Sequence, residues 1–369
     1  MPTAPRIIWY LTAHGYGHGV RSTAVMQALR RECPGVRLTV VSALPEDFLR
    51  DRLRGFPDGD LAFRRAAFDV GLVQLDSVRA DIPATLGKVE ALLARRPALV
   101  DEETAWLRAS APSAVVADIP AVPLAAAARA GLPRIAIGNF SWDWIYEPYA
   151  ETDPRWRPAV DAFRTDYAVA DVLLQYPLSP DMSATFPRRI GIPLPARPGR
   201  PRRAGLAART GADPARRWIL LSFTTLDWTP DALARAAAIA DTEFFTVRPL
   251  EWPGIPNIHA VDRGEFPFSD IVATVDAVLS KPGFGILADC AANGKPLIYA
   301  DRENFAEYPV LERAIKTRFR HVHIPAADLY AGNLAPSLDA LASAPPPPSR
   351  LPLGGDTAAA REILRRARG

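Results

Sequence analysis

A loop rich in histidine and glycine follows the first apolar run of the 369-residue chain. In this loop, AHGYGHGVRS, His14 and His18 stand four residues apart and Arg21 follows three residues later. Imidazole is the side chain best suited to take a proton from a hydroxyl near neutral pH. We therefore predict that His18 and His14 are catalytic and that Arg21 meets an anionic ligand. A helix-capping His18 and a solvated Arg21 are the alternatives, and Gly15 and Gly17 would let a substrate approach the backbone.

A second glycine-rich stretch, KPGFG, opens a predicted helix in the second half of the chain. The N-terminus of a helix presents unpaired N–H groups and a positive dipole end to anions. We therefore predict that a pyrophosphate binds here, on Lys281, Gly283, Phe284 and Gly285. For either glycine cluster, a purely structural turn is the alternative.

Acidic residues follow this second loop. Asp289 lies one turn inside the predicted helix, and Asp301, Glu303 and Glu307 come after the next predicted strand. A carboxylate from Asp289 or Glu307 could accept hydrogen bonds from ribose hydroxyls. For Glu307 the alternative is an acid that stabilises a helix start through the dipole.

Further candidates follow strands of the first half. Asp118, in VVADIP, could orient the His18 imidazole or could cap a helix near Pro120. The aromatic run FSWDWIYEPY suits sugar rings or apolar acceptors, with core packing as the alternative. Its candidate acceptor contacts are Trp142, Trp144 and Tyr146. His321 and His323 have no third ligand in view, so we expect no metal site and no cofactor.

The order of apolar and helical segments indicates how these motifs are held. Apolar strands such as RIIWYLT, SAVVADI and WILLSFT alternate with helical segments in both halves, with the tract 82–109 interrupted by Pro97. Such alternation indicates parallel sheets covered on both faces. We predict two doubly wound, Rossmann-like α/β domains facing a cleft. The expected parts are an N-terminal domain at 1–192, a proline- and arginine-rich linker at 193–215, a C-terminal domain at 216–341, and a Pro-rich segment with a terminal helix capped by Asp356 or Thr357 at 342–369.

Composition excludes other classes. Hydrophobic residues make up 49% and charged residues 23%, as in soluble globular proteins. The 44 basic and 41 acidic side chains are too balanced for nucleic acid to be the main partner. No apolar run approaches the roughly 20 residues that span a bilayer, and the N-terminus lacks the order of a signal peptide, so we expect a cytoplasmic protein.

The motifs together resemble the two-domain GT-B glycosyltransferases, including the branch with the lipid II-forming N-acetylglucosaminyltransferase. They are more similar to the predicted glycosyltransferases related to the N-terminal part of plant L-arabinokinase. HGYGHGVRS, VVADIP, GNFSWDWIY and SKPGFGILADCAANGKPLIYADRENFAEYPVL have similar counterparts there in the same order. The resemblance extends to about Leu341.

This resemblance implies a nucleotide-sugar donor, such as a UDP-sugar, on the second domain and an acceptor bearing a hydroxyl or amine on the first. The acceptor that it implies is a small molecule or a lipid, and a lipid would bring peripheral membrane contact. The resemblance implies that His18 is the base, that residues 283–285 hold the donor phosphates, and that Asn304 and Glu307 contact the donor.

The sequence also departs from its relatives. Thr224 and Thr225 stand where relatives commonly have glycines, although their hydroxyls could donate to a phosphate, and Asp289 stands where relatives usually have glutamate. We expect a glycosyltransferase. A nucleotide-sugar hydrolase, whose GxGHxxR loop is similar, and a nucleotide-sugar-binding protein without turnover are the alternatives.

Overall fold

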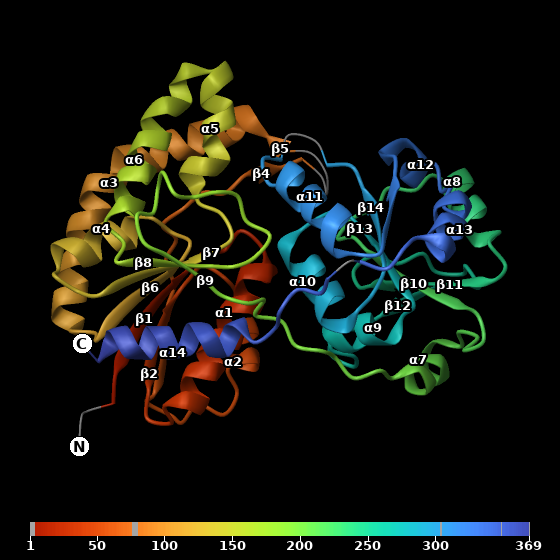
Figure 1. The fold of residues 1–369 in the computed structure, drawn as a ribbon, viewed down its shortest axis with the longest axis horizontal. Coiled ribbons are helices and arrows are strands. Elements are labelled where there is room, and N and C mark those ends of the chain that lie inside the picture. The colour runs from red at the N-terminus through yellow and green to blue at the C-terminus, as the bar shows by residue number, and fades with distance from the viewer. Residues whose placement is uncertain (1–3, 76–79, 303–304, 348, 369) are drawn as a thin grey trace. The chain divides into compact units, whose positions relative to one another are not determined.

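The computed structural model describes residues 4–75, 80–302, 305–347 and 349–368 (Figure 1). The chain forms two compact units. Unit 1 comprises Met1–Val73, Asp81–Pro195 and Pro352–Gly369, and unit 2 comprises Gln74–Ala80 and Ala196–Leu351. The residues of unit 1 therefore come from three separate stretches of the chain.

Unit 1 is built on a seven-stranded parallel sheet with the strand order β3-β2-β1-β6-β7-β8-β9. Its strands are β1 (Arg6–Leu11), β2 (Arg37–Val41), β3 (Leu61–Arg64), β6 (Ala114–Asp118), β7 (Arg134–Gly138), β8 (Val172–Gln175) and β9 (Arg189–Gly191). The central strand β1 is apolar along its length because helices cover both faces of the sheet. The strand order reverses between the parallel strands β1 and β6, where Leu11 is in register with Asp118. In doubly wound sheets, ligands bind at this switch point, beyond the carboxyl ends of the strands.

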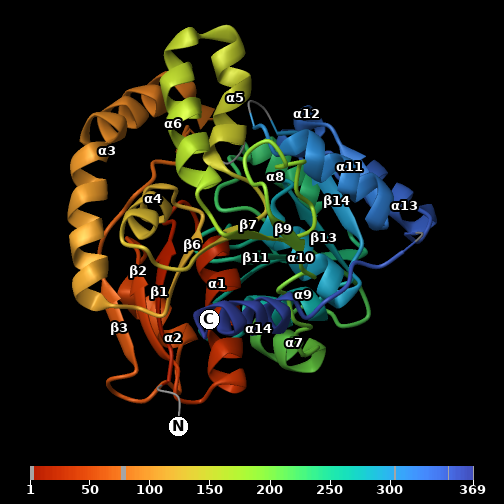
Figure 2. The same ribbon diagram turned by 60° about the vertical axis from the view of Figure 1, so that its left-hand side comes forward.

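Helices cover both faces of this sheet (Figures 1 and 2). One face carries α1 (Tyr16–Glu32), α2 (Glu46–Arg52) and α14 (Gly355–Ala367), and the other carries α3 (Ile82–Ser110), α4 (Val122–Arg129) and α6 (Arg157–Ala168). The connection from β7 also contains α5 (Trp142–Thr152) and the short 3-10 helix η1 (Pro154–Trp156). Two short strands, β4 (Val73–Gln74) and β5 (Ala80–Asp81), pair with each other.

Unit 2 repeats this architecture around a six-stranded parallel sheet with the order β12-β11-β10-β13-β14-β15. Its strands are β10 (Arg217–Ser222), β11 (Thr242–Val247), β12 (Ile258–Val261), β13 (Ala277–Ser280), β14 (Leu297–Ala300) and β15 (His321–Ile324). Its helices are α7 (Arg203–Thr210), α8 (Pro230–Ala237), α9 (Phe268–Thr274), α10 (Phe284–Asn293), α11 (Tyr308–Arg318), α12 (Ala326–Tyr330) and α13 (Ala335–Ser343). The switch point lies between β10 and β13. The predicted fold class, two doubly wound α/β domains, is confirmed.

Two details differ from the expectations. Helix α3 continues through Pro97 instead of stopping there, because buried side chains on both sides of the proline, Val89 and Val100 among them, keep the helix packed on unit 1. Helix α14 begins after Gly354, whose φ of 96° favours glycine, so neither Asp356 nor Thr357 is its cap. Asp356 is buried and binds Arg31 of α1 instead.

The stretch 193–215, expected as a linker, is partly structured. Leu194 pairs with Leu353 in unit 1, and residues 203–210 form α7 of unit 2. The last helix, α14, packs on α1 of unit 1. The proline-rich stretch is therefore where the chain passes from unit 1 to unit 2, and parts of it belong to the folded units.

Candidate active site

His18 lies at the switch point of the unit 1 sheet. Helix α1 starts directly after β1, with Gly15 at its N-cap in a backbone conformation (φ 126°) that favours glycine. His18 is the third residue of α1, so it does not cap the helix. Asp118 ends β6, the neighbouring strand, and its carbonyl accepts a hydrogen bond from the Thr12 amide at 2.9 Å. The reversal of strand order thus brings together two residues that are 100 positions apart.

A compact polar network surrounds Asp118. His18 Nδ1 lies 3.0 Å from Asp118 Oδ1, and Ser22 Oγ donates to Oδ2 at 2.6 Å. Arg21 donates to both carboxylate oxygens, from Nη2 at 2.5 Å and from Nε at 3.0 Å, and to Asn139 Oδ1 at 2.6 Å. Asp118 is therefore a partner of the imidazole and does not cap α4, whose N-cap is Ala121. Arg21 is buried within this network, so the alternative of a solvated arginine is wrong.

The charges of this network set the protonation of His18. Burial, and then the positive charge of Arg21, lower the pKa of His18 despite the opposing effect of Asp118. Burial alone would raise the pKa of Asp118, but Arg21 and His18 outweigh it and hold that pKa far below its usual range. At neutral pH the pair therefore consists of a neutral imidazole and a carboxylate.

One ring nitrogen of His18 faces away from this network. Both Asp118 Oδ1 and Arg21 Nη2, the latter at 2.8 Å, lie next to Nδ1. Among the residues that the structure describes, none hydrogen-bonds Nε2, and 13% of the side chain is exposed. When Nδ1–H donates to the carboxylate, Nε2 carries a lone pair that can accept a proton.

His14 forms a second histidine–carboxylate pair in unit 1. Its Nε2 lies 3.1 Å from Oδ1 of Asp69, a residue that the sequence analysis did not single out. The side chain of His14 is 27% exposed, whereas that of Asp69 is 2% exposed. Asp69 lies in an irregular segment before β4 with no periodic pattern, so no signal in the sequence pointed to it.

The three candidate acceptor aromatics differ in accessibility. Trp142 and Tyr146 are buried and stack on each other, with ring centroids 5.6 Å apart. Their polar atoms point inward, since Trp142 Nε1 donates to Asp69 and Tyr146 Oη donates to the Gly71 carbonyl. Trp144 is half-buried. The packing alternative therefore accounts for Trp142 and Tyr146 in the structure.

Loops after three strands meet at the switch point of unit 2. Ser280 Oγ, at the end of β13, donates to the Ser222 carbonyl at the end of β10 at 2.9 Å. Arg302, after β14, donates from Nη1 to the Pro282 carbonyl at 3.2 Å, and its guanidinium lies 3.3 Å from the Phe305 ring centroid. The exposed Thr224 and Thr225 follow β10, and the loop 281–285 follows β13.

Helix α10 opens directly from this loop. Gly283 is its N-cap and supplies no side-chain cap, and its first turn contains no acidic residue. A Cβ at Gly283 or Gly285 would meet no atom within 4 Å, so there is open space beside the backbone. The start of α10, with Lys281 before it, has the composition and shape of an anion site.

The acidic candidates lie on the elements that follow. Asp289 is half-buried on α10, and the buried Glu307 is the N-cap residue of α11 without making a side-chain cap bond. Asp301 binds His323 Nε2 at 2.7 Å. Asn304 and Glu303 lie outside the described residues.

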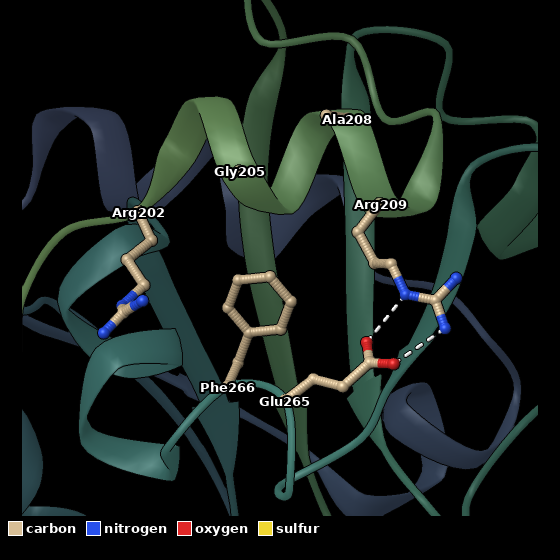
Figure 3. Close-up of a pocket in the computed structure, with 6 residues that line it drawn as sticks. All are labelled: Arg202, Gly205, Ala208, Arg209, Glu265 and Phe266. Atoms are coloured by element: carbon tan, nitrogen blue, oxygen red, sulfur yellow. Dashed lines mark hydrogen bonds and ion pairs between the residues drawn. The ribbon is translucent and has the colours of Figure 1, made fainter.

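A surface hollow of about 770 Å³ lies elsewhere in unit 2 (Figure 3). It is lined by Arg202, Gly205, Ala208, Arg209, Glu265 and Phe266, between α7 and the loop before α9. Arg209 and Glu265 form a double ion pair at its rim, with distances of 2.7 and 2.8 Å. This hollow contains none of the residues predicted from the sequence.

Among the described residues, no group of three or more His, Cys, Asp or Glu side chains is placed to hold a metal ion. None of the helices described is long and apolar enough to cross a bilayer.

The sequence of the chain is similar to part of one curated protein. No protein-family model matches the sequence. The chain is 27% identical to the L-arabinokinase of Arabidopsis thaliana over 342 residues, which is 92% of this chain but 32% of that protein. The chain therefore spans about a third of the length of this curated relative.

Solved glycosyltransferases share the fold over nearly the whole chain. The glycosyltransferase of kitacinnamycin matches with a TM-score of 0.67 and 16% identity, covering 99% of this chain and all of the other. The calicheamicin glycosyltransferase CalG4 matches with a TM-score of 0.63 and 17% identity, covering 100% and 94%. UGT89C1 of Arabidopsis thaliana, solved with UDP-L-rhamnose, matches with a TM-score of 0.59 and 15% identity, covering 98% and 94%. The chain thus has the two-domain α/β fold of GT-B glycosyltransferases, and its sequence is similar to part of an L-arabinokinase.

Proposed function

We propose that this protein transfers a sugar from a nucleotide diphosphate sugar to a hydroxyl or amine of a small-molecule or lipid acceptor. The observation that carries the proposal is the His18–Asp118 pair at the switch point of unit 1. It supplies a neutral imidazole with its Nδ1 side engaged and its Nε2 available. The similarity in fold to UGT89C1, solved with UDP-L-rhamnose, supports a nucleotide-sugar donor.

In the proposed reaction, His18 Nε2 takes the proton of the acceptor while the acceptor atom attacks the anomeric carbon of the sugar. The bond from this carbon to the diphosphate breaks, and the diphosphate leaves with the bonding electrons. Asp118 keeps Nδ1 protonated and stabilises the imidazolium that forms. The loop 281–285 would stabilise the leaving diphosphate through the amides at the start of α10 and the charge of Lys281.

The donor side can be tested by binding. UDP, GDP, dTDP, CDP and ADP are each added to the purified protein, and the melting temperature is measured. A nucleotide at ~100 times its Kd stabilises the folded state by about 2.7 kcal/mol. For a unit of this size that corresponds to a rise of about 5–10 °C. If none of the five shifts the melting temperature, the donor site proposed at 281–285 is wrong.

The catalytic side can be tested by turnover. His18→Ala should lower kcat by about 10²–10⁴-fold, the usual contribution of a general base, with nucleotide binding retained. His259→Ala is the matched control, because His259 also pairs with a buried carboxylate, Glu243, at 2.7 Å in unit 2. This control should keep its turnover. Stoichiometric release of free sugar without any acceptor product would show that the protein is a hydrolase. Tight nucleotide binding without any turnover would show that it only binds nucleotide sugars.

A further inference from the structure

The His14–Asp69 pair holds an irregular segment of unit 1 against the histidine loop. Asp69 Oδ1 meets His14 Nε2 at 3.1 Å, and Oδ2 accepts a hydrogen bond from Trp142 Nε1 at 2.9 Å. Two residues later, the Gly71 carbonyl accepts from Tyr146 Oη at 3.1 Å. Residues 69–71 are therefore bound both by the loop after β1 and by α5.

The shape of this segment is fitted to His14. Gly71 has a φ of 72°, and a Cβ there would lie 2.4 Å from two atoms of the imidazole. Glycine at this position thus permits both the backbone conformation and the close approach of the ring. The ring is held between the carboxylate of Asp69 and the backbone of Gly71.

A continuous set of ring contacts runs from His14 to His18. His14 meets the Trp142 ring edge-on at 5.6 Å, and Trp142 meets Phe140 edge-on at 5.2 Å. Phe140 in turn meets His18 edge-on at 5.7 Å. His14 therefore packs on Trp142 and His18 on Phe140, and these two buried aromatic side chains contact each other.

We propose that His14 and Asp69 are positioning residues for the sugar transfer proposed above: they fix Trp142 and Phe140, and thereby the orientation of the His18 ring. This inference rests on the proposed function for its catalytic meaning. It gives the buried Trp142 a supporting role in place of acceptor contact. It also gives Asp69 a role, which is to hold His14 and Trp142 in place.

The charges around His14 make this arrangement depend on pH. The groups that face the His14 ring are Asp69, Lys88 of α3 and Trp142. Burial alone would lower the pKa of His14, but the charge and hydrogen bonds of Asp69 outweigh it and raise that pKa. His14 thus stays protonated to a higher pH than an ordinary histidine, whereas the pKa of His18 is lowered. Turnover should rise with pH as His18 loses its proton and fall again as His14 loses its own.

The test is a pH titration of the five histidines, followed by the NMR signals of their Cε1 protons. Asp69→Asn should lower the pKa of His14, because it removes the paired charge. It should also lower that of His18, since the charge of Asp69 reaches this ring too. His14→Asn keeps the Asp69–Trp142 bond and should shift the His18 signal if the ring moves.

Kinetics separate positioning from a merely structural role. Either variant should lower kcat by about 100-fold, as small misplacements of catalytic groups do, with the KM for the donor unchanged and the fall at alkaline pH lost. Glu243→Gln is the matched control, because it removes a buried histidine partner in unit 2 and should leave the His14 and His18 signals in place.

The two proposals fail in different ways. If the parent protein turns over no donor, the proposed function fails, while the NMR titration still decides the inference. If Asp69→Asn does not fold, His14→Asn carries the test. A His18 titration that is unchanged in every folded variant overturns the inference.

Discussion

Replacing Asp118 by asparagine tests the network around His18 through stability. The change keeps the size of the side chain but removes the negative charge that binds Arg21 and His18. Arg21 then remains buried without its counter-charge. Breaking a buried pair in this way typically costs about 3–5 kcal/mol. At about 2–4 °C per kcal/mol for a unit of this size, the melting temperature should fall by ~6–20 °C.

The control is Asp101→Asn, because Asp101 pairs with Arg129 at 2.5 Å on the exposed surface. Surface pairs contribute about 0–1 kcal/mol, so this variant should melt within a few degrees of the parent protein. Both variants are measured by circular dichroism at pH 7. A loss for Asp118→Asn no larger than that for Asp101→Asn would refute the reasoning.

The loss of stability caused by Asp118→Asn should also depend on pH. The pKa of Asp118 is depressed in the folded state, so its contribution is present above the unfolded pKa of about 3.9. That contribution is lost as the pH falls through the folded pKa. The two melting temperatures should therefore converge only in strong acid. If the difference in melting temperature between the parent protein and Asp118→Asn grew on acidification, it would contradict a depressed pKa of Asp118 in the folded state.

Two more predictions concern the second pair. In urea unfolding, Gly71→Ala should lower the free energy of unfolding by about 1–3 kcal/mol more than Gly131→Ala does. Both glycines have a φ near 71°, but only at Gly71 would a Cβ collide with His14. Equal losses in the two variants would show that the close approach of His14 to Gly71 has no effect on stability. In a double-mutant cycle, the coupling between His14 and Asp69 should be largest between the unfolded pKa values of about 3.9 and 6.5, where both groups are charged, and should fall as the pH rises through the raised pKa of His14. A coupling that grows at alkaline pH would show that the pair is not ionic.

The sequence predicts the parts of the site that lie on regular elements. Asp118 ends a strand in a parallel sheet, and a residue at that edge was expected near the loop after the first strand. Asp69 could not be predicted, because it follows no strand or helix and its contact with His14 spans 55 positions. Contacts of this kind depend on the tertiary path of an irregular segment.

The aromatic run shows how a local pattern can be misinterpreted. Trp142 and Tyr146 are four residues apart, so on α5 they share one face, which is buried. The interpretation as an open aromatic surface gave too little weight to this helical spacing. Thr224 and Thr225, in contrast, are exposed just after β10.

The return of α14 to unit 1 affects the order in which the units can fold during synthesis. All six strands of the unit 2 sheet precede α14 in the chain, so that sheet can form while the C-terminal helix is still missing. The buried side of α14, which includes Ile363 and Leu364, covers α1 only after residues 355–367 have been made. Although unit 1 starts first, it is the unit completed last, and its apolar α1 surface must be kept from aggregation until then.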